Sequence, residues 1–174
     1  MKVLMLSGRK ISVFACLLLI AGCGYQLVGK ETHVPSGMVS LAIPTFINKT
    51  LEPGIEIPFT EAFLGEFIFD RRLKILDRTE ADSTLEGVIK SFGIYSASYD
   101  RSGQVLEYQT NVVIDLVLKK KTGEIAWKET NLSETQWYRA SSIGVLNETS
   151  KAVAVRNIAR FVAERVRNRL FHNF

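Results

Sequence analysis

Few residues in this chain are of a type that could perform catalysis or bind a metal ion. The sequence holds two cysteines, Cys16 and Cys23, and two histidines, His33 and His172, which stand far apart along the chain. A metal site or a nucleophilic triad needs such residues in groups, and neither a phosphate-binding loop nor a glycine-rich dinucleotide turn occurs. We therefore expect no catalytic residue, no metal site and a protein that is not an enzyme.

Cys23 is the residue whose sequence context points to a specific reaction. Basic residues precede the apolar stretch 11–21, which has roughly half the length of a membrane-spanning helix. This order is typical of a secretory signal. Ile20-Ala21-Gly22-Cys23 then resembles the bacterial lipobox, in which a signal peptidase cuts before the cysteine and its thiol carries a diacylglycerol. The alternative is an ordinary signal followed by an incidental cysteine.

Lipid attachment would make residues 1–22 a lipoprotein signal peptide and residues 23–37 a lipid-anchored tether. Diacylglycerol and an N-acyl chain such as palmitate would bury many methylene groups, at about 0.8 kcal/mol each, and hold the protein firmly on a membrane. No cofactor other than these covalent lipids is expected. Because Gly24 and not Asp follows the cysteine, the sequence predicts the periplasmic side of a Gram-negative outer membrane.

The charge of the chain does not point to nucleic acid as a partner. The 174 residues include 22 Lys and Arg against 18 Asp and Glu, a formal charge of +4. Removal of the signal takes away Lys2, Arg9 and Lys10, so 19 basic residues remain against 18 acidic ones. A charge near zero lacks the footprint of a protein that binds a phosphate backbone.

Hydrophobic periodicity predicts one α+β domain over residues 38–174. Apolar residues stand at even positions from 106 to 118, with 110 as the exception, which indicates a strand with one buried face. A stripe at 59, 62, 63 and 67 and steps of three or four from 152 to 170 indicate two helices. The predicted elements are strand 39–43, helix 58–69, strand 73–76, strands 85–99 and 106–119 joined as a hairpin, strand 125–137, and a helix of about 20 residues with Asn147 as N-cap.

This order predicts two helices packed on one face of a mostly antiparallel four-stranded sheet. Gly87 and Gly93 interrupt the pattern of the strand that holds them, which suggests a bulge or a close approach of backbone.

Lys119, Lys120 and Lys121 form a group of like charges at a predicted hairpin tip. The simpler interpretation is a hydrated, solubilising turn. The functional interpretation is a patch for anionic phosphate groups, which other basic residues would join if the sheet brings them together: Arg101, Lys128 and Lys90. The arginines of the last helix are interpreted as charges on its solvent-facing side.

Aromatic side chains gather on the central strands. Tyr95, Tyr99 and Tyr108 surround the central hairpin, and the next strand holds Trp127, Trp137 and Tyr138. Core packing explains most of them, while a residue near the hairpin tip, such as Tyr99, is a candidate for contact with a partner.

Several segments, in the same order along nearly the whole chain after the signal, resemble one known family. They are Cys23-Gly24-Tyr25-Gln26-Leu27, then Ile43-Pro44-Thr45-Phe46 with Asn48 and Thr50, Glu52-Pro53-Gly54-Ile55-Glu56, the strand around Tyr108, Gly123-Glu124-Ile125-Ala126-Trp127 and the arginine-rich last helix. This pattern is similar to that of the LptE family of lipopolysaccharide-assembly lipoproteins.

The resemblance implies partners and not a reaction. Family members plug the lumen of the large outer-membrane β-barrel LptD, help it to assemble, and bind lipopolysaccharide on its way to the cell surface. No ligand-site motif of the family can be matched here, so charge and position select Lys119, Lys120, Lys121, Arg101 and Lys128 for lipopolysaccharide, and Tyr95, Tyr99 and Tyr108 for the barrel. The alternative is a lipid-anchored periplasmic module of another envelope transport or assembly system.

Overall fold

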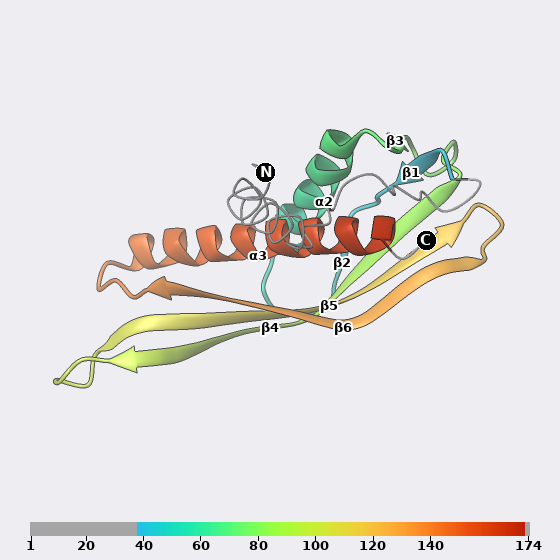
Figure 1. Cartoon of the computed structure of the whole chain (residues 1–174). Helices are drawn as coiled ribbons and strands as arrows, with labels where there is room; N and C mark the ends of the chain where they lie inside the picture. The colour runs from blue at the N-terminus through green and yellow to red at the C-terminus, as the bar shows by residue number, and fades with distance from the viewer. Residues whose placement is uncertain (1–37, 173–174) are drawn as a thin grey trace, which may run out of the picture. The chain divides into compact units, whose positions relative to one another are not determined.

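The computed structural model describes residues 38–172, which form two helices and a six-stranded mixed sheet (Figure 1). Cys23 and the predicted signal and tether lie outside these residues. The elements are β1 (Ser40–Ala42), β2 (Ile47–Asn48), α2 (Glu56–Asp70), β3 (Lys74–Ile75), β4 (Ser83–Tyr99), β5 (Val105–Lys120), β6 (Ile125–Arg139) and α3 (Gly144–His172).

The three long strands form the predicted antiparallel meander. β5 lies between β4 and β6, and both its neighbours run antiparallel to it. The turns at its two ends each contain a glycine with positive φ, Gly103 at 83° and Gly123 at 89°, a conformation that other residues rarely adopt. These turns fix the order of the strands along the chain.

The prediction of four strands is wrong because three short strands extend the sheet in parallel. β1 pairs in parallel with β3 on one side and with β4 on the other, while β2 pairs in parallel with a later part of β4. A parallel connection needs a crossover, and α2 supplies it between β1 and β3. All three residues of β1 are buried, including the polar Ser40. Val39, which precedes β1 and was expected to face the core, is 61% exposed.

Both helices lie on the same side of the sheet, as predicted (Figure 1). α2 directs Phe59, Phe63 and Phe67 into the core and ends where Arg71 takes a left-handed conformation, with φ at 61°. α3 is longer than predicted and begins at Gly144, before Asn147. Asn147 therefore lies inside the first turn, and its side-chain oxygen accepts the N–H of Ser141 at 3.4 Å.

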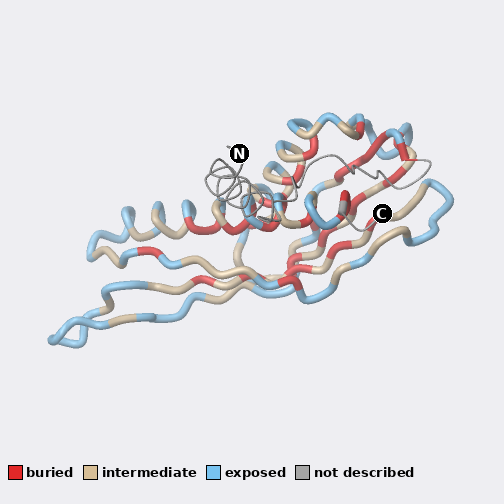
Figure 2. The backbone as a smooth tube through the Cα atoms, in the orientation of Figure 1, coloured by how far each residue is buried: buried red, intermediate tan, exposed pale blue. Residues whose placement is uncertain are grey.

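Burial is uneven along the long strands. Buried residues of β4 and β5 are concentrated where the helices cover the sheet, and the end of the hairpin that joins these two strands is exposed (Figure 2). The core therefore lies between the two helices and one face of the sheet, while the β4–β5 turn extends beyond it.

At both glycines of β4, an aromatic ring packs closely against the backbone. The sequence predicted either such a close approach or a bulge at these positions. The ring of Phe46 lies against Gly87, in the position that a Cβ atom would occupy, and its centroid is 4.9 Å from that of Phe63. Tyr95 covers Gly93 in the same way on the other face of the sheet, where a Cβ atom on Gly93 would lie 2.6 Å from the tyrosine hydroxyl oxygen.

Two bulges, one on each side of β5, change which residues face the helices. In β4 the register shifts at Lys90, so buried residues occupy odd positions up to Ile89 and the helix-facing residues are even from Phe92 to Ser96, after which the register shifts again. In β6 two residues, Thr130 and Asn131, stand opposite Asp115. β5 itself keeps its even positions inward throughout.

A polar cluster joins the two bulges across β5. It lies on the face of the sheet opposite the two helices, which we call the helix-free face. Lys90 Nζ lies 3.4 Å from Asp115 Oδ2 and donates a hydrogen bond to Asn131 Oδ1 at 2.7 Å. The backbone N–H of Asn131, whose φ is 57°, donates to Asp115 Oδ1 at 2.7 Å. One carboxylate thus holds both strands at the level where their registers shift.

Replacing Gly87 with alanine is expected to destabilise the protein by about 1–3 kcal/mol, because the new methyl group overlaps the buried Phe46 ring. The matched control is Gly65→Ala in α2, where no atom lies within 4 Å of the new Cβ. This control should gain about 0.5–1 kcal/mol from higher helix propensity. Urea unfolding measures both, and equal stabilities would contradict the packing assigned to Phe46.

The pH dependence of stability should include a term from Asp82. Hydrogen bonds from Ser40 Oγ at 2.8 Å and from the Val39 N–H at 3.3 Å hold the Asp82 pKa below its ordinary value of 3.8. The carboxylate therefore stabilises the fold above that value and stops doing so as the pH falls through the lower folded pKa. Asp82→Asn should lose less thermal stability than the wild type between about pH 6 and pH 3; parallel losses would contradict this role.

Candidate functional site

The three lysines of the β5–β6 turn lie together but already have partners. Lys119 Nζ is 2.5 Å from Glu86 Oε2, and Lys120 Nζ is 3.0 Å from Glu124 Oε2. Lys121 Nζ donates to the backbone oxygen of Thr79 at 3.3 Å. Exposed ion pairs of this kind are weak, since water solvates both charges, so an anionic ligand could exchange for the carboxylates.

Lys128 is the other predicted residue that the fold brings near this turn. It is exposed on β6 and pairs across the ladder with Val117, which in turn pairs with Glu86 of β4. Lys119 lies two residues further along β5, so both ammonium groups belong to the same end of the sheet and to its helix-free face.

Arg101 is not part of this group. It lies in the β4–β5 turn, whereas the lysines lie in the β5–β6 turn, and β5 separates the two turns by 16 residues, or roughly 50 Å of strand. Lys90 is also absent from the turn, because it belongs to the cluster with Asp115 and Asn131. The predicted patch therefore reduces to four lysines at one end.

The three tyrosines predicted to contact a barrel divide between different surfaces. Tyr95 is 62% exposed on the helix-free face, and Tyr99 is 59% exposed beside the β4–β5 turn. Tyr108 points to the helix side, where its ring centroid is 5.5 Å from that of Tyr138. Burial raises the pKa of Tyr138, and the pair forms part of the packing under the start of α3.

Trp137 is a surface aromatic that the sequence did not select. It is 58% exposed, and it stands in one cross-strand row with Gln109 and Tyr95 on the helix-free face. The two rows that follow on this face hold Gly93, Asn111 and Thr135, and then Ser91, Val113 and Ser133. Asn111 Nδ2 donates hydrogen bonds to Ser133 Oγ at 2.8 Å and to Thr135 Oγ1 at 3.0 Å. This part of the helix-free face is therefore mainly polar, and two large aromatic side chains, Tyr95 and Trp137, stand out from it.

The arginines of α3 were expected to lie on its solvent-facing side, but three of them form ion pairs with neighbouring elements, although Arg169 remains exposed. Arg167 bridges the helices through Glu66 at 2.5 Å and Asp70 at 3.7 Å. Arg165 pairs with Glu134, and Arg169 pairs with Glu129, so both reach the helix-facing side of β6. These ion pairs attach α3 to α2 and to the outermost long strand.

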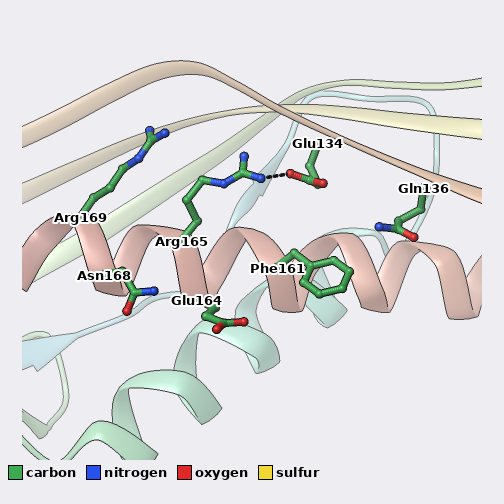
Figure 3. Close-up of a pocket in the computed structure, with 7 residues that line it drawn as sticks. All are labelled: Glu134, Gln136, Phe161, Glu164, Arg165, Asn168 and Arg169. Atoms are coloured by element: carbon green, nitrogen blue, oxygen red, sulfur yellow. Dashed lines mark hydrogen bonds and ion pairs between the residues drawn. The ribbon is translucent and has the colours of Figure 1, made fainter. Parts of the chain in front are cut away.

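A groove of about 500 Å³ runs between α3 and β6 (Figure 3). Arg165 reaches across it to Glu134, and Gln136 and the 39% exposed Phe161 also line it. Further residues of α3 line the other end: Glu164, Asn168 and Arg169. The groove combines one ring, two amide groups, the Arg165–Glu134 ion pair and the charges of Glu164 and Arg169.

A second groove of about 500 Å³ separates the start of α2 from α3. Lys151 stands in it, 2.7 Å from Glu148 and 2.9 Å from Glu52, and the hydrogen bond to Glu148 is the main reason why the Lys151 pKa is raised. This lysine therefore links α3 to the loop before α2.

The described residues offer neither a metal site nor a helix that could span a membrane. Among residues 38–172, no three His, Cys, Asp or Glu side chains come together in a way that could hold a metal ion. The helices of that region are also each too short or too polar to cross a membrane.

Two solved structures share the fold at low sequence identity. Rare lipoprotein B from Shewanella oneidensis superposes with a TM-score of 0.53 at 13% identity, over 76% of this chain and 95% of that one. A lipoprotein B from Nitrosomonas europaea gives 0.53 at 13% identity, over 85% and 90%. At such identities the likeness concerns the fold alone.

Sequence comparison assigns the family. The search of curated proteins gave no match. The family model described as "LptE: Lipopolysaccharide-assembly" matches residues 38–170, which are nearly all the residues that the structure describes. The chain therefore belongs to the LptE family of lipopolysaccharide-assembly proteins, as its segments suggested.

Proposed function

We propose that this protein is an outer-membrane lipoprotein, attached through Cys23, that plugs a β-barrel lipopolysaccharide translocon of the LptD type and helps it to assemble. The observation that carries the proposal is the family match over residues 38–170. The role is structural and does not require the protein to be an enzyme.

The helix-free face supports the part of the proposal that concerns the barrel. The inner wall of a large barrel is polar, because lipid-facing and lumen-facing residues alternate along its strands. A plug must therefore present polar groups, and this face offers the Asn111, Ser133 and Thr135 cluster. Tyr95 and Trp137 stand out from it and provide the kind of aromatic contact that dominates protein interfaces.

The turn between β5 and β6 supports the part that concerns lipopolysaccharide. Its lysines belong to one end of the sheet, and the carboxylates that pair with Lys119 and Lys120 are partly exposed. Lipid A phosphates could displace these carboxylates, since ammonium–phosphate hydrogen bonds are stronger than neutral ones. Arg101 would contact another part of the ligand, or the barrel, because it lies at the far end of β5.

Tagged full-length protein, extracted from membranes in detergent, should co-purify with a large barrel subunit. Combined Tyr95→Ala and Trp137→Ala should release that subunit while leaving thermal stability nearly unchanged, because both side chains are mostly exposed. The matched control, Tyr95→Phe with Trp137→Phe, keeps the aromatic area and should retain the complex. Purification of the wild-type protein without any barrel would refute the plug.

Binding to lipopolysaccharide micelles should weaken about tenfold or more when Lys120, Lys121 and Lys128 are all changed to glutamine, since each lost charged hydrogen bond contributes about 1.5–3 kcal/mol. Lys119 is left in place because it stabilises the pair with Glu86. Arg101→Gln serves as the control at the other end of β5 and should have a smaller effect. Unchanged affinity of the triple variant in a fluorescence displacement assay would remove this turn from the mechanism.

A further inference from the structure

β6 is an edge strand with a free side. In the part of the chain that the structure describes, the sheet ends at β6, and its only strand partner is β5. Beyond the bulge, Leu132 to Arg139 pair with β5 residue by residue without a register shift. This stretch contains no proline and no lysine, two of the residues by which proteins usually protect an exposed edge.

The ladder determines which backbone groups point away from β5. The N–H of Ala140 donates to the oxygen of Leu106 at 2.9 Å, so this pair exchanges hydrogen bonds with the neighbouring strand. In an antiparallel ladder such pairs alternate with pairs that make no bond. The residues that direct N–H and C=O toward the free side are therefore Ser133, Thr135, Trp137 and Arg139.

The groove between α3 and β6 runs along this free side (Figure 3). A strand added to β6 would place every second side chain over the helix side, next to Phe161, Gln136 and Asn168. The remaining side chains would lie on the helix-free face beside Trp137. Unpaired backbone groups and a groove for alternate side chains are the two elements of recognition by strand addition.

We infer that the groove between β6 and α3 binds an extended peptide segment of a partner protein, which adds to the edge of β6 as a further strand. This site goes beyond the proposed function and requires neither the barrel nor lipopolysaccharide. The segment it accepts is uncharged, with apolar or amide side chains on the helix side, because both arginines of the groove already have carboxylate partners, Arg165 in Glu134 and Arg169 in Glu129. Glu164, the remaining charged residue of the lining, is exposed to solvent.

A second copy of this chain fits the edge less well than a single strand does. α3 packs over β6 and is held there by Arg165 and Arg169. Two β6 strands paired edge to edge would lie about 4.8 Å apart. Two α3 helices, each above its own β6, would then lie closer than the about 8–10 Å that packed helices require.

Amide hydrogen exchange of the full-length protein, measured by NMR, tests the inference. The probe is a capped synthetic peptide that copies residues 108–114, an uncharged strand whose side chains already match β6 on its other side. Saturating peptide should slow exchange at least tenfold at Ser133, Thr135 and Trp137. The amides of Glu134 and Gln136, bonded to β5, should be slow with or without peptide.

Thr135→Pro removes an outward-pointing N–H without breaking a backbone hydrogen bond to β5, at a position where an edge strand tolerates proline. The side-chain hydrogen bond from Asn111 to Thr135 Oγ1 is lost in this variant and in its control alike. It should weaken peptide binding at least tenfold, measured from the change in Trp137 fluorescence, whereas the matched control Thr135→Val keeps the N–H and should bind within about twofold of the wild type. If the proline variant fails to fold, the exchange pattern of the wild-type protein still decides.

Four results would overturn the inference. Exchange at Ser133, Thr135 and Trp137 could be unaffected by peptide, or the slowed amides could belong to the free part of β4, such as Ile94. The three amides could also be slow before peptide is added, which would mean that another segment of the chain covers the edge. Protection that rises with protein concentration, together with dimers in sedimentation, would assign the edge to a second copy.

Discussion

The two bulges beside β5 decide which side chains are available for binding. With an unbroken alternation in β4, Tyr95 would face the helices like Leu85 and Ile89; the shift at Lys90 turns it to the helix-free face. The shift opposite Asp115 does the same for Trp137 in β6 and turns Glu134 inward, toward Arg165. Asp115 contacts both bulges. One carboxylate therefore holds the register shifts that decide which side chains lie on the helix-free face and which line the groove between α3 and β6.

The bulges also explain which parts of the sheet could be predicted from the sequence and which could not. β5 has no bulge of its own at this level, and its even positions face inward as the alternation predicted. A bulge leaves no comparable signal, because one inserted residue looks like an irregular polar position. Trp137 was therefore not distinguished from the aromatic residues explained by core packing, although it lies on the surface. The stripe of Phe59, Phe63 and Phe67 predicted α2 well, since a helix turns all three toward the same neighbours.

Pairings between distant segments were harder to predict than the elements themselves. Strands were predicted at the positions of β1 and β3, but their parallel pairing was not, because it depends on how α2 returns the chain to the same edge of the sheet. The ion-pair partners of charged residues were equally hard to predict. A sequence gives the number of arginines in α3 but not that Arg165 and Arg169 meet glutamates of β6 or that Arg167 meets Glu66. The lysines of the β5–β6 turn could be grouped because they are adjacent in the chain. Whether Arg101 joins them depended on the arrangement of the strands, which places it at the other end of β5.

The internal pairing of charges also limits what kind of contact each surface can make. Near the β5–β6 turn, Glu124, the carboxylate partner of Lys120, is exposed, so an anion can replace it at small cost. Between α3 and β6, Glu134 is mostly buried under Arg165, so a charged ligand there would have to separate a shielded pair. Affinity at that edge must come from backbone hydrogen bonds and from the exposed rings of Phe161 and Trp137. An anionic glycolipid and a peptide strand would therefore bind at different places on the same sheet and could bind at the same time.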